Sequence, residues 1–302
     1  VPGDFDNDGD IDYIAGNVGQ NSFYKASDQY PVSVYAKDFD NNGSYDAIPS
    51  LYLPTSMEDQ AKREFPAQGR DDLIKQMIAM RSKFQSYRTY AMSTMDSVLS
   101  PEQLKGAIIY RANNLKSCYS RNDGNGKFSL QPLPTQAQFS MLCGMVADDF
   151  DGDGNLDVVI NGNDYGTDVS TGRYDALNGL FMKGDGKGNF MPLTILQSGI
   201  YIPGNGKALV KLRSKSGSCL LAAAQNRGPL KIFKAKCNLH FIPLQPNDVS
   251  AAIQYKNGKI QKQECYYGNS FLSQSARFID ADANVASVTI TDASGHQRKI
   301  DL

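Results

Sequence analysis

The sequence predicts an all-β chain that is interrupted by one helical segment and followed by a small C-terminal β unit. Three observations predict this fold. Short apolar runs alternate with glycine, asparagine and aspartate turns over most of the chain. Three aspartate-rich loops are each followed by a run typical of a strand. Helical spacing of apolar residues interrupts this pattern between about residues 57 and 106.

The three loops are copies of one pattern, and the first copy reads D-F-D-N-D-G-D-I-D. Each copy carries oxygen-bearing side chains at positions 1, 3, 5 and 9, and a glycine at position 6 that can take the positive φ of a sharp turn. Crowded carboxylates repel one another, whereas a hard cation with six to eight oxygen ligands, usually Ca²⁺, turns that repulsion into binding. Position 7 would add its backbone carbonyl. The predicted ligands of about three Ca²⁺ ions are Asp4, Asp6, Asp8, Asp10 and Asp12; Asp38, Asp40, Asn42, Ser44 and Asp46; and Asp149, Asp151, Asp153, Asn155 and Asp157.

The alternative for each loop is a polar turn that its own aspartates close without a metal. Three copies with the same phenylalanine at position 2 favour the metal. The loops are not EF-hands, because the glutamate that an EF-hand needs at position 12 is replaced by Ala15, Pro49 and Ile160. Charge count ranks the second loop as the weakest site, since Asn42 stands where the other two loops have an aspartate.

The first part of the chain is expected to hold short strands at 32–36 and 47–53, followed by the helical segment. Asp71 is a candidate N-cap, and a second helix should begin at Ser100, with Pro101 in its first turn and Gln103 at the capping-box position. The apolar stripe of the segment either packs on the β domain or serves as a docking surface for a partner. Its members are Leu73, Met77, Met80, Phe84, Tyr87, Ala91 and Met95.

From Ile108 the strand pattern returns. Near Pro243 the pattern changes again, to strands joined by short hairpin turns. Two hairpins are predicted beyond that point, with turns at Asn257-Gly258 and Ser294-Gly295. The expected organisation is therefore a calcium-binding domain over residues 1–242, which includes the helical insertion, and a small β unit over residues 243–302.

The loops and their following strands resemble the FG-GAP and VCBS repeats, the blade units of integrin-alpha-type β-propellers. The glycine-rich hairpins Asn122–Phe128 and Gly184–Phe190 belong to the same resemblance. The segment Asn257–Arg277 is similar to the ASPIC/UnbV segment that follows such repeats in bacterial surface proteins and cartilage acidic proteins. The resemblance implies propeller-like blades, bound calcium, and a secreted or cell-surface location, with the bacterial outer surface or periplasm favoured.

The chain departs from that pattern in two ways. The loops are unevenly spaced, starting at Asp4, Asp38 and Asp149, and the longer interval holds the helical insertion. The remaining β residues suffice for about four blades, whereas propellers close with four to eight. An incomplete propeller, with further blades upstream of Val1, is therefore one interpretation.

Bulk composition excludes some partners. The net charge of −1 gives no overall field that attracts nucleic acid, and no apolar run is long enough to span a bilayer. Among five cysteines no C-x-x-C spacing occurs; Cys143 is expected in the core, and Cys219 could pair with Cys237 across strands. His240 and His296 lack a recognisable catalytic motif.

The predicted function is a calcium-stabilised binding or scaffold module for an unknown protein or glycan ligand, without catalysis. Alternatives are a carbohydrate-active enzyme with a propeller cleft and a purely structural module of a larger surface protein. Two polar segments outside the loops could contact a ligand or tie blades together. Their candidate residues are Asp164, Asp168, Arg173, Tyr174 and Asp175 in the first, and Gln225, Asn226 and Arg227 in the second.

Overall fold

The computed structural model of the chain describes all residues except 57–60, 170, 216 and 236–239. The described chain is mostly β, in several small antiparallel sheets, none of which closes into a barrel. It divides into two compact units. Unit 1 comprises Val1–Asn21 and Lys116–Leu302, and unit 2 comprises Ser22–Leu115. The dividing points differ from the expected boundary near residue 243, because the C-terminal sheets form one compact unit with the strands that precede them.

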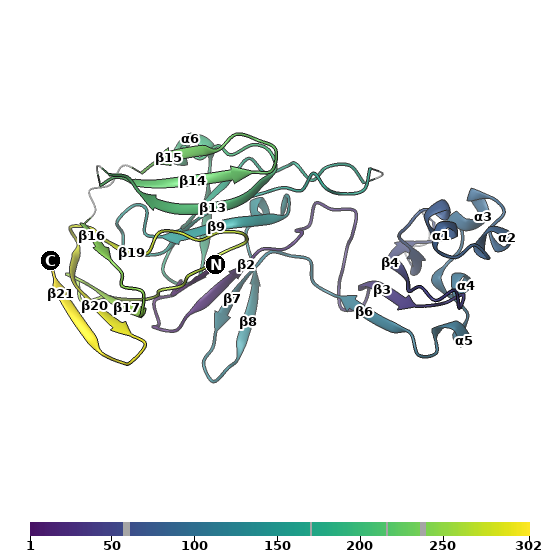
Figure 1. Cartoon of the computed structure of the whole chain (residues 1–302), viewed down its shortest axis with the longest axis horizontal. Coiled ribbons are helices and arrows are strands. Elements are labelled where there is room, and N and C mark those ends of the chain that lie inside the picture. Colours follow the sequence, from purple (N-terminus) through teal and green to yellow (C-terminus); the bar gives the residue numbers. More distant parts are fainter. Residues whose placement is uncertain (57–60, 170, 216, 236–239) are drawn as a thin grey trace. The chain divides into compact units, whose positions relative to one another are not determined.

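Two four-stranded sheets of unit 1 share one chain order: strand, aspartate loop, strand, long connection, strand, glycine-rich hairpin, strand. In the first sheet, unit 2 forms the long connection between the second and third strands. In the second sheet, residues 163–179 form the equivalent connection. The first sheet has the order β1-β2-β7-β8, with β1 Pro2–Gly3, β2 Asp12–Ala15, β7 Cys118–Asn122 and β8 Phe128–Pro132. The second has the order β12-β11-β10-β9, with β9 Leu142–Asp148, β10 Asp157–Gly162, β11 Leu180–Gly184 and β12 Phe190–Leu193. Figure 1 labels β2, β7 and β8 of the first sheet and β9 of the second.

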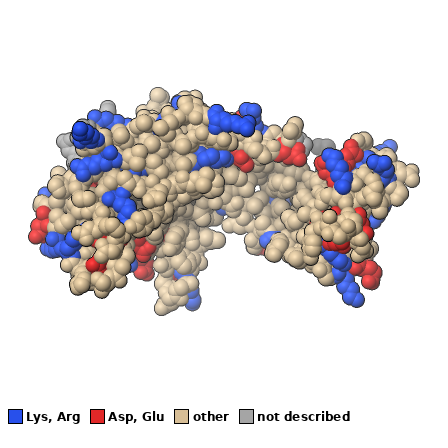
Figure 2. Space-filling view, in the orientation of Figure 1, with Lys and Arg blue, Asp and Glu red and all other residues tan. Residues whose placement is uncertain are grey.

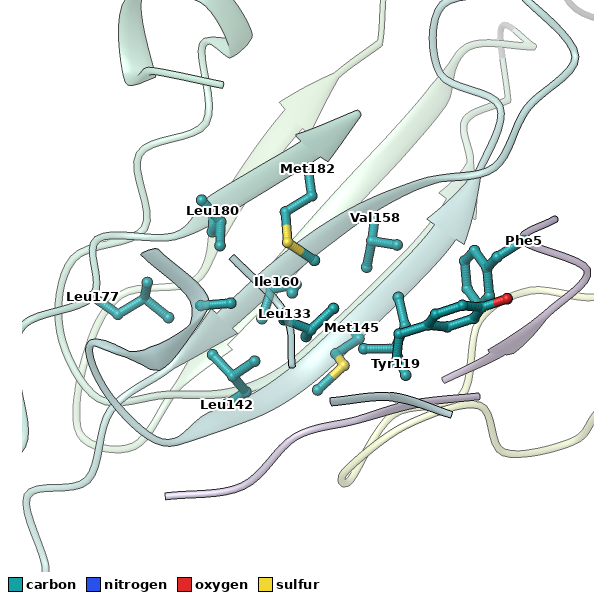
Figure 3. Close-up of a cluster of buried hydrophobic side chains, with 12 residues drawn as sticks. Phe5, Tyr119, Leu133, Leu142, Met145, Val158, Ile160, Leu177, Leu180 and Met182 are labelled. Carbon is teal, nitrogen blue, oxygen red and sulfur yellow. The ribbon is translucent and has the colours of Figure 1, made fainter. Parts of the chain in front are cut away.

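A third, three-stranded sheet follows, formed by β13 Gly206–Arg213, β14 Cys219–Gln225 and β15 Lys231–Lys234. Strands β9 and β10 of the second sheet are buried on both faces, which agrees with their nearly continuous apolar sequences. Val158 and Ile160 join the cluster in Figure 3, which has Phe5 and Tyr119 at one end and Leu177 and Leu180 at the other. Val159, on the opposite face, packs with residues of the third sheet. The three sheets therefore pack face to face in chain order. Short helical turns η1 (Thr135–Gln138) and α6 (Ile195–Ser198) lie in the connections.

The C-terminal strands of unit 1 form a pair and a four-stranded sheet. The pair is β16 His240–Pro243 with β19 Phe278–Ala281. The sheet has the order β18-β17-β20-β21, with β17 Asp248–Tyr255, β18 Ile260–Glu264, β20 Val285–Asp292 and β21 Gln297–Asp301. Gly258 and Gly295 take positive φ in the two predicted hairpin turns, which are confirmed.

Unit 2 packs a sheet against a group of short helices. The sheet has the order β5-β4-β3-β6, with β3 Val32–Lys37, β4 Asp46–Pro54, β5 Lys62–Pro66 and β6 Ile108–Ala112. The helices are α1 Arg70–Gln76, α2 Met80–Lys83, α3 Tyr87–Ala91, α4 Met95–Val98 and α5 Pro101–Leu104. The helical segment is thus shorter than expected, since residues 62–66 extend the sheet.

Of the two predicted helix starts in this unit, one is confirmed and the other is wrong. Ser100 caps α5 through a capping box with Gln103, as predicted. The N-cap of α1 is Gly69, however, and Asp71 lies within the first turn. Asp71 still suits that place, because an acidic side chain is favourable near a helix N-terminus.

The apolar stripe is buried on the sheet of unit 2 along its first half. Phe84 is 4% exposed and packs with Tyr35 and Ile48, so packing rather than docking is confirmed there. Tyr87 is 66% exposed and Ala91 is exposed, whereas Tyr90 is buried in their place. Met95, the last residue of the stripe, is buried in the same cluster as Phe84, as predicted. The chain leaves helical geometry at Phe84 and starts a new helix after Ser86, which resets the phase of the stripe.

The described part also settles some smaller predictions. Cys143 is buried in β9, as expected. The proposed partner of Cys219, Cys237, lies outside the described residues. Within the described part of the chain, no helix has the length and apolar character that a membrane crossing requires. On the face drawn in Figure 2, basic and acidic side chains are interspersed, which agrees with a net charge near zero.

Candidate functional site

The three aspartate loops have one backbone geometry. The position-6 glycines take φ values of 94°, 90° and 79°, which is the sharp turn that the sequence predicted. Position 4 is also left-handed, with φ between 59° and 80°, and it is occupied by residue types that tolerate this region. The residues concerned are Gly9, Gly43 and Gly154 at position 6 and Asn7, Asn41 and Gly152 at position 4.

The position-9 aspartates, Asp12, Asp46 and Asp157, are buried and brace the loops from within. In each loop their Oδ2 accepts the backbone N–H of the position-2 phenylalanine, at 3.0–3.2 Å. In unit 1 the other oxygen reaches the third strand of the sheet. Asp12 Oδ1 accepts the N–H of Asn122 at 2.8 Å, and Asp157 Oδ1 accepts the N–H of Gly184 at 3.0 Å. This carboxylate therefore joins the loop to the hairpin that follows it.

The remaining carboxylates converge on a centre in each loop. Oxygen atoms of three aspartates lie within 4.8 Å of one another in every copy. The position-9 residue belongs to the group only in the second loop. In the other two loops both oxygens of this residue accept backbone hydrogen bonds. The groups are Asp4, Asp6 and Asp8; Asp38, Asp40 and Asp46; and Asp149, Asp151 and Asp153.

Several of these oxygens are buried and have no hydrogen-bond partner among the residues that the structure describes. Asp4 is fully buried and its Oδ1 has none, although its Oδ2 accepts the N–H of Lys262 at 3.2 Å. Asp6 Oδ1 and Asp40 Oδ1 are likewise buried and have no hydrogen-bond partner in the described part of the chain. A buried carboxylate oxygen without a partner is costly, and a cation held by oxygen atoms removes that cost. The candidate donors are all oxygens: carboxylates in every loop, with an amide at Asn42 in the second and at Asn155 in the third, which fits Ca²⁺.

The pKa values of the loop carboxyls reflect the same crowding. Burial, and then the neighbouring charges of Asp12 and Asp8, raise the pKa of Asp6 to about 6. Burial raises the pKa of Asp149 to about 6 and that of Asp157 to about 7, with nearby aspartates adding to the effect. These carboxyls resist ionisation when no cation is bound, so metal binding and proton release are coupled.

The remaining neighbours of the loop carboxylates are the position-7 residues and the C-terminal sheet. Asp10 and Ser44 are exposed, consistent with a contribution from the backbone alone. Asn155 Oδ1 accepts hydrogen bonds from Asn7 of the first loop at 3.2 Å and from Lys259 at 2.7 Å. The first and third loops are thus neighbours, and both touch the C-terminal sheet.

Some of these contacts have no signal in the sequence. Lys259, Lys262 and Lys183 approach the loops from strands or turns far away in the chain. Asn122 and Gly184 could have been found, since both begin the glycine-rich hairpins that match one another in sequence.

The two additional polar segments are largely engaged in local contacts. Asp164 and Tyr174 exchange backbone hydrogen bonds at 2.8 and 2.9 Å, and the Asp164 carboxylate lies 3.4 Å from Lys207. Arg173 stacks on Tyr165, the Asp168 carbonyl accepts the N–H of Thr171, and Asp175 is exposed. The segment is a hairpin rather than an open pocket of carboxylates.

The second polar segment is a turn at the end of β14. Gln225 donates to the Pro229 carbonyl at 3.1 Å, and the Asn226 N–H donates to the Asn205 carbonyl. Arg227 has a positive φ of 56°, which places it within the turn. These contacts favour a structural role, in which the segment holds neighbouring strands together, over a role as a ligand site.

No family model matches the chain, and no curated protein matches its sequence.

Proposed function

We propose that each of the three loops binds a Ca²⁺ ion and that the chain is a calcium-stabilised, propeller-type binding or scaffold module. The observation that carries the proposal is the fully buried Asp4, whose Oδ1 lacks a partner beside Asp6 and Asp8. Without a cation, the chain would hold the buried Asp4 carboxylate beside two further carboxylates without compensation.

The ion would have a structural role. In the first loop Asp4, Asp6 and Asp8 would hold it with the backbone carbonyl of Asp10, and the equivalent residues would do so in the other two. The position-9 carboxylate supports the turn, so a filled loop fixes both the strand pair and the hairpin behind it. Calcium modules outside cells work at modest affinity, which agrees with a secreted or surface location.

The stacking of the sheets supports the propeller interpretation. Both faces of β9 and β10 are buried, one by residues of the first sheet and the other by residues of the third. Consecutive sheets that pack face to face are typical of neighbouring blades. The ligand of such a module, a protein or a glycan, would meet its exposed loops.

Ion stoichiometry tests the proposal directly. We expect about three Ca²⁺ per chain by equilibrium dialysis, a higher melting temperature with Ca²⁺ than with Mg²⁺, and the loss of one ion in each of Asp6→Asn, Asp40→Asn and Asp151→Asn. Asp301→Asn is the matched control, because this exposed carboxylate lies in β21, outside the loops, and pairs with Lys299. Unchanged stoichiometry in the three loop variants would contradict the proposal.

A further inference from the structure

The third strands of the two four-stranded sheets carry a basic residue at the same place. Residues 118–128 and 180–190 align without a gap, reading C-Y-S-R-N-D-G-N-G-K-F and L-F-M-K-G-D-G-K-G-N-F. The N–H groups of Asn122 and Gly184 bind the position-9 aspartate in the same way. Arg121 and Lys183, which directly precede them, are therefore structurally equivalent.

These two equivalent side chains have different partners. The Lys183 ammonium contacts Asp151 and lies 3.0 Å from Asp153 Oδ2, so it bridges positions 3 and 5 of the third loop. Arg121 instead pairs with Asp123 of its own hairpin, through Nε at 2.7 Å and Nη2 at 2.6 Å.

The hairpins explain the difference. Asp123 accepts hydrogen bonds from Arg121 and from Ser129. Its counterpart Asp185 is already engaged by its own turn, accepting from the Asn189 side chain at 2.8 Å and from the N–H groups of Lys187 and Asn189. Lys183 consequently finds its carboxylate partners in the loop.

We propose, on the basis of the proposed calcium function, that Lys183 is an internal competitor that weakens cation binding by the third loop relative to the first. Both loops have four aspartates at positions 1, 3, 5 and 9, so charge count alone would give them equal affinity. A cation entering the third loop must first displace an ammonium from two of its ligands, whereas the equivalent Arg121 contacts its own hairpin acid instead.

The test compares chains that keep one loop each. Asp6→Asn with Asp40→Asn retains the third loop, and Asp40→Asn with Asp151→Asn retains the first. Lys183→Met in the third-loop chain should tighten Ca²⁺ binding about fivefold by calorimetry, the size expected for a partly exposed ion pair. Arg121→Met in the first-loop chain should leave the affinity unchanged. Lys183→Arg should keep the weak affinity, and Lys183→Gln takes the place of Lys183→Met if that variant fails to fold.

A second readout reports on the lysine itself. After reductive ¹³C-methylation, the Lys183 resonance should shift as Ca²⁺ fills the third loop, because the ammonium leaves its carboxylates. Equal affinities of the third-loop chain with and without Lys183→Met, or an equal gain from Arg121→Met, would overturn the inference while leaving calcium binding intact. Failure of the third-loop chain to bind Ca²⁺ in either form would instead overturn the proposed function of that loop.

Discussion

The first and second four-stranded sheets of unit 1 differ most in one segment, the connection between their second and third strands. In the second sheet a short connection between Gly162 and Leu180 joins these strands, and it includes a bridge between Asp164 and Tyr174; in the first sheet all of unit 2 makes the connection. Even so, β2 and β7 pair in register, with Ile14 opposite Tyr119. The connection thus differs between the two sheets, while the loop, the strands and the hairpin recur in both.

The position-9 carboxylate shows why the sheet tolerates such a long insertion. Asp12 ties the first loop to Asn122, although all of unit 2 lies between them in the sequence, just as Asp157 ties the third loop to Gly184. The entropy of closing a loop grows only slowly with its length, so a folded insertion adds little cost to this pairing.

The second loop, in unit 2, has different support. Its Asp46 accepts the Phe39 N–H, but β5 pairs with β4 only from Ser50 onward and lies too far along to supply the further N–H that unit 1 provides. A helix residue takes part instead, since Gln76 Oε1 accepts the N–H of Ala47 at 2.9 Å. The same loop pattern is thus braced by a strand in unit 1 and by a helix in unit 2.

The largest expected effect tests whether unit 2 has a core of its own. Phe84→Ala should destabilise unit 2 by about 3–5 kcal/mol, because it opens a cavity among buried residues. Met92→Ala, which removes a side chain that is 74% exposed, should change stability by less than about 0.5 kcal/mol. Chemical denaturation followed by hydrogen exchange would separate the units, and an equal shift of unit 1 would show that they unfold together.

An intermediate effect concerns the pH dependence of unit 1 in chelator. The folded-state pKa values of Asp149 and Asp157, about 6 and about 7, lie above the ordinary value of 3.8. The folded chain then binds more protons than the unfolded chain, so its stability should fall as pH rises from about 4 to 7. Saturating Ca²⁺ should remove this trend, because the ion requires the ionised carboxylates. Melting temperatures of the metal-free chain that rise over this range would contradict the assignment.

The smallest effect is expected from removing the insertion. Joining Asn21 to Lys116 through a short Gly/Ser linker should leave the melting temperature of unit 1 within about 4 °C of the parent, roughly 1 kcal/mol for a domain of this size. The shortened chain should also bind one Ca²⁺ fewer. Loss of the β2–β7 pairing, observed as rapid exchange of the Tyr119 amide, would show that the first sheet depends on unit 2.

Local signals in the sequence predicted the local structure well. The loop turns at Gly9, Gly43 and Gly154, the capping box at Ser100, and the hairpin at Gly258 each depend on the conformational preferences of a few adjacent residues. The strands that flank the loops and the mostly β character follow from the same kind of pattern. For this reason the candidate calcium ligands could be named residue by residue.

Contacts between distant segments had no such signal. The sequence could not show that residues 22–115 interrupt one sheet, because strand pairing joins Ile14 to Tyr119 regardless of what lies between them. Two residues of the apolar stripe, Tyr87 and Ala91, are exposed, since a new helix begins after the cap at Ser86 and places Tyr90 on the buried face instead. Whether Lys183 faces solvent or the third loop depended on how the turn beyond it satisfies Asp185. Sequence alone determined which residues can form a turn, a cap or an oxygen-rich loop; the tertiary structure decided which of them meet, because hydrogen bonds and burial act between groups that the chain brings together only on folding.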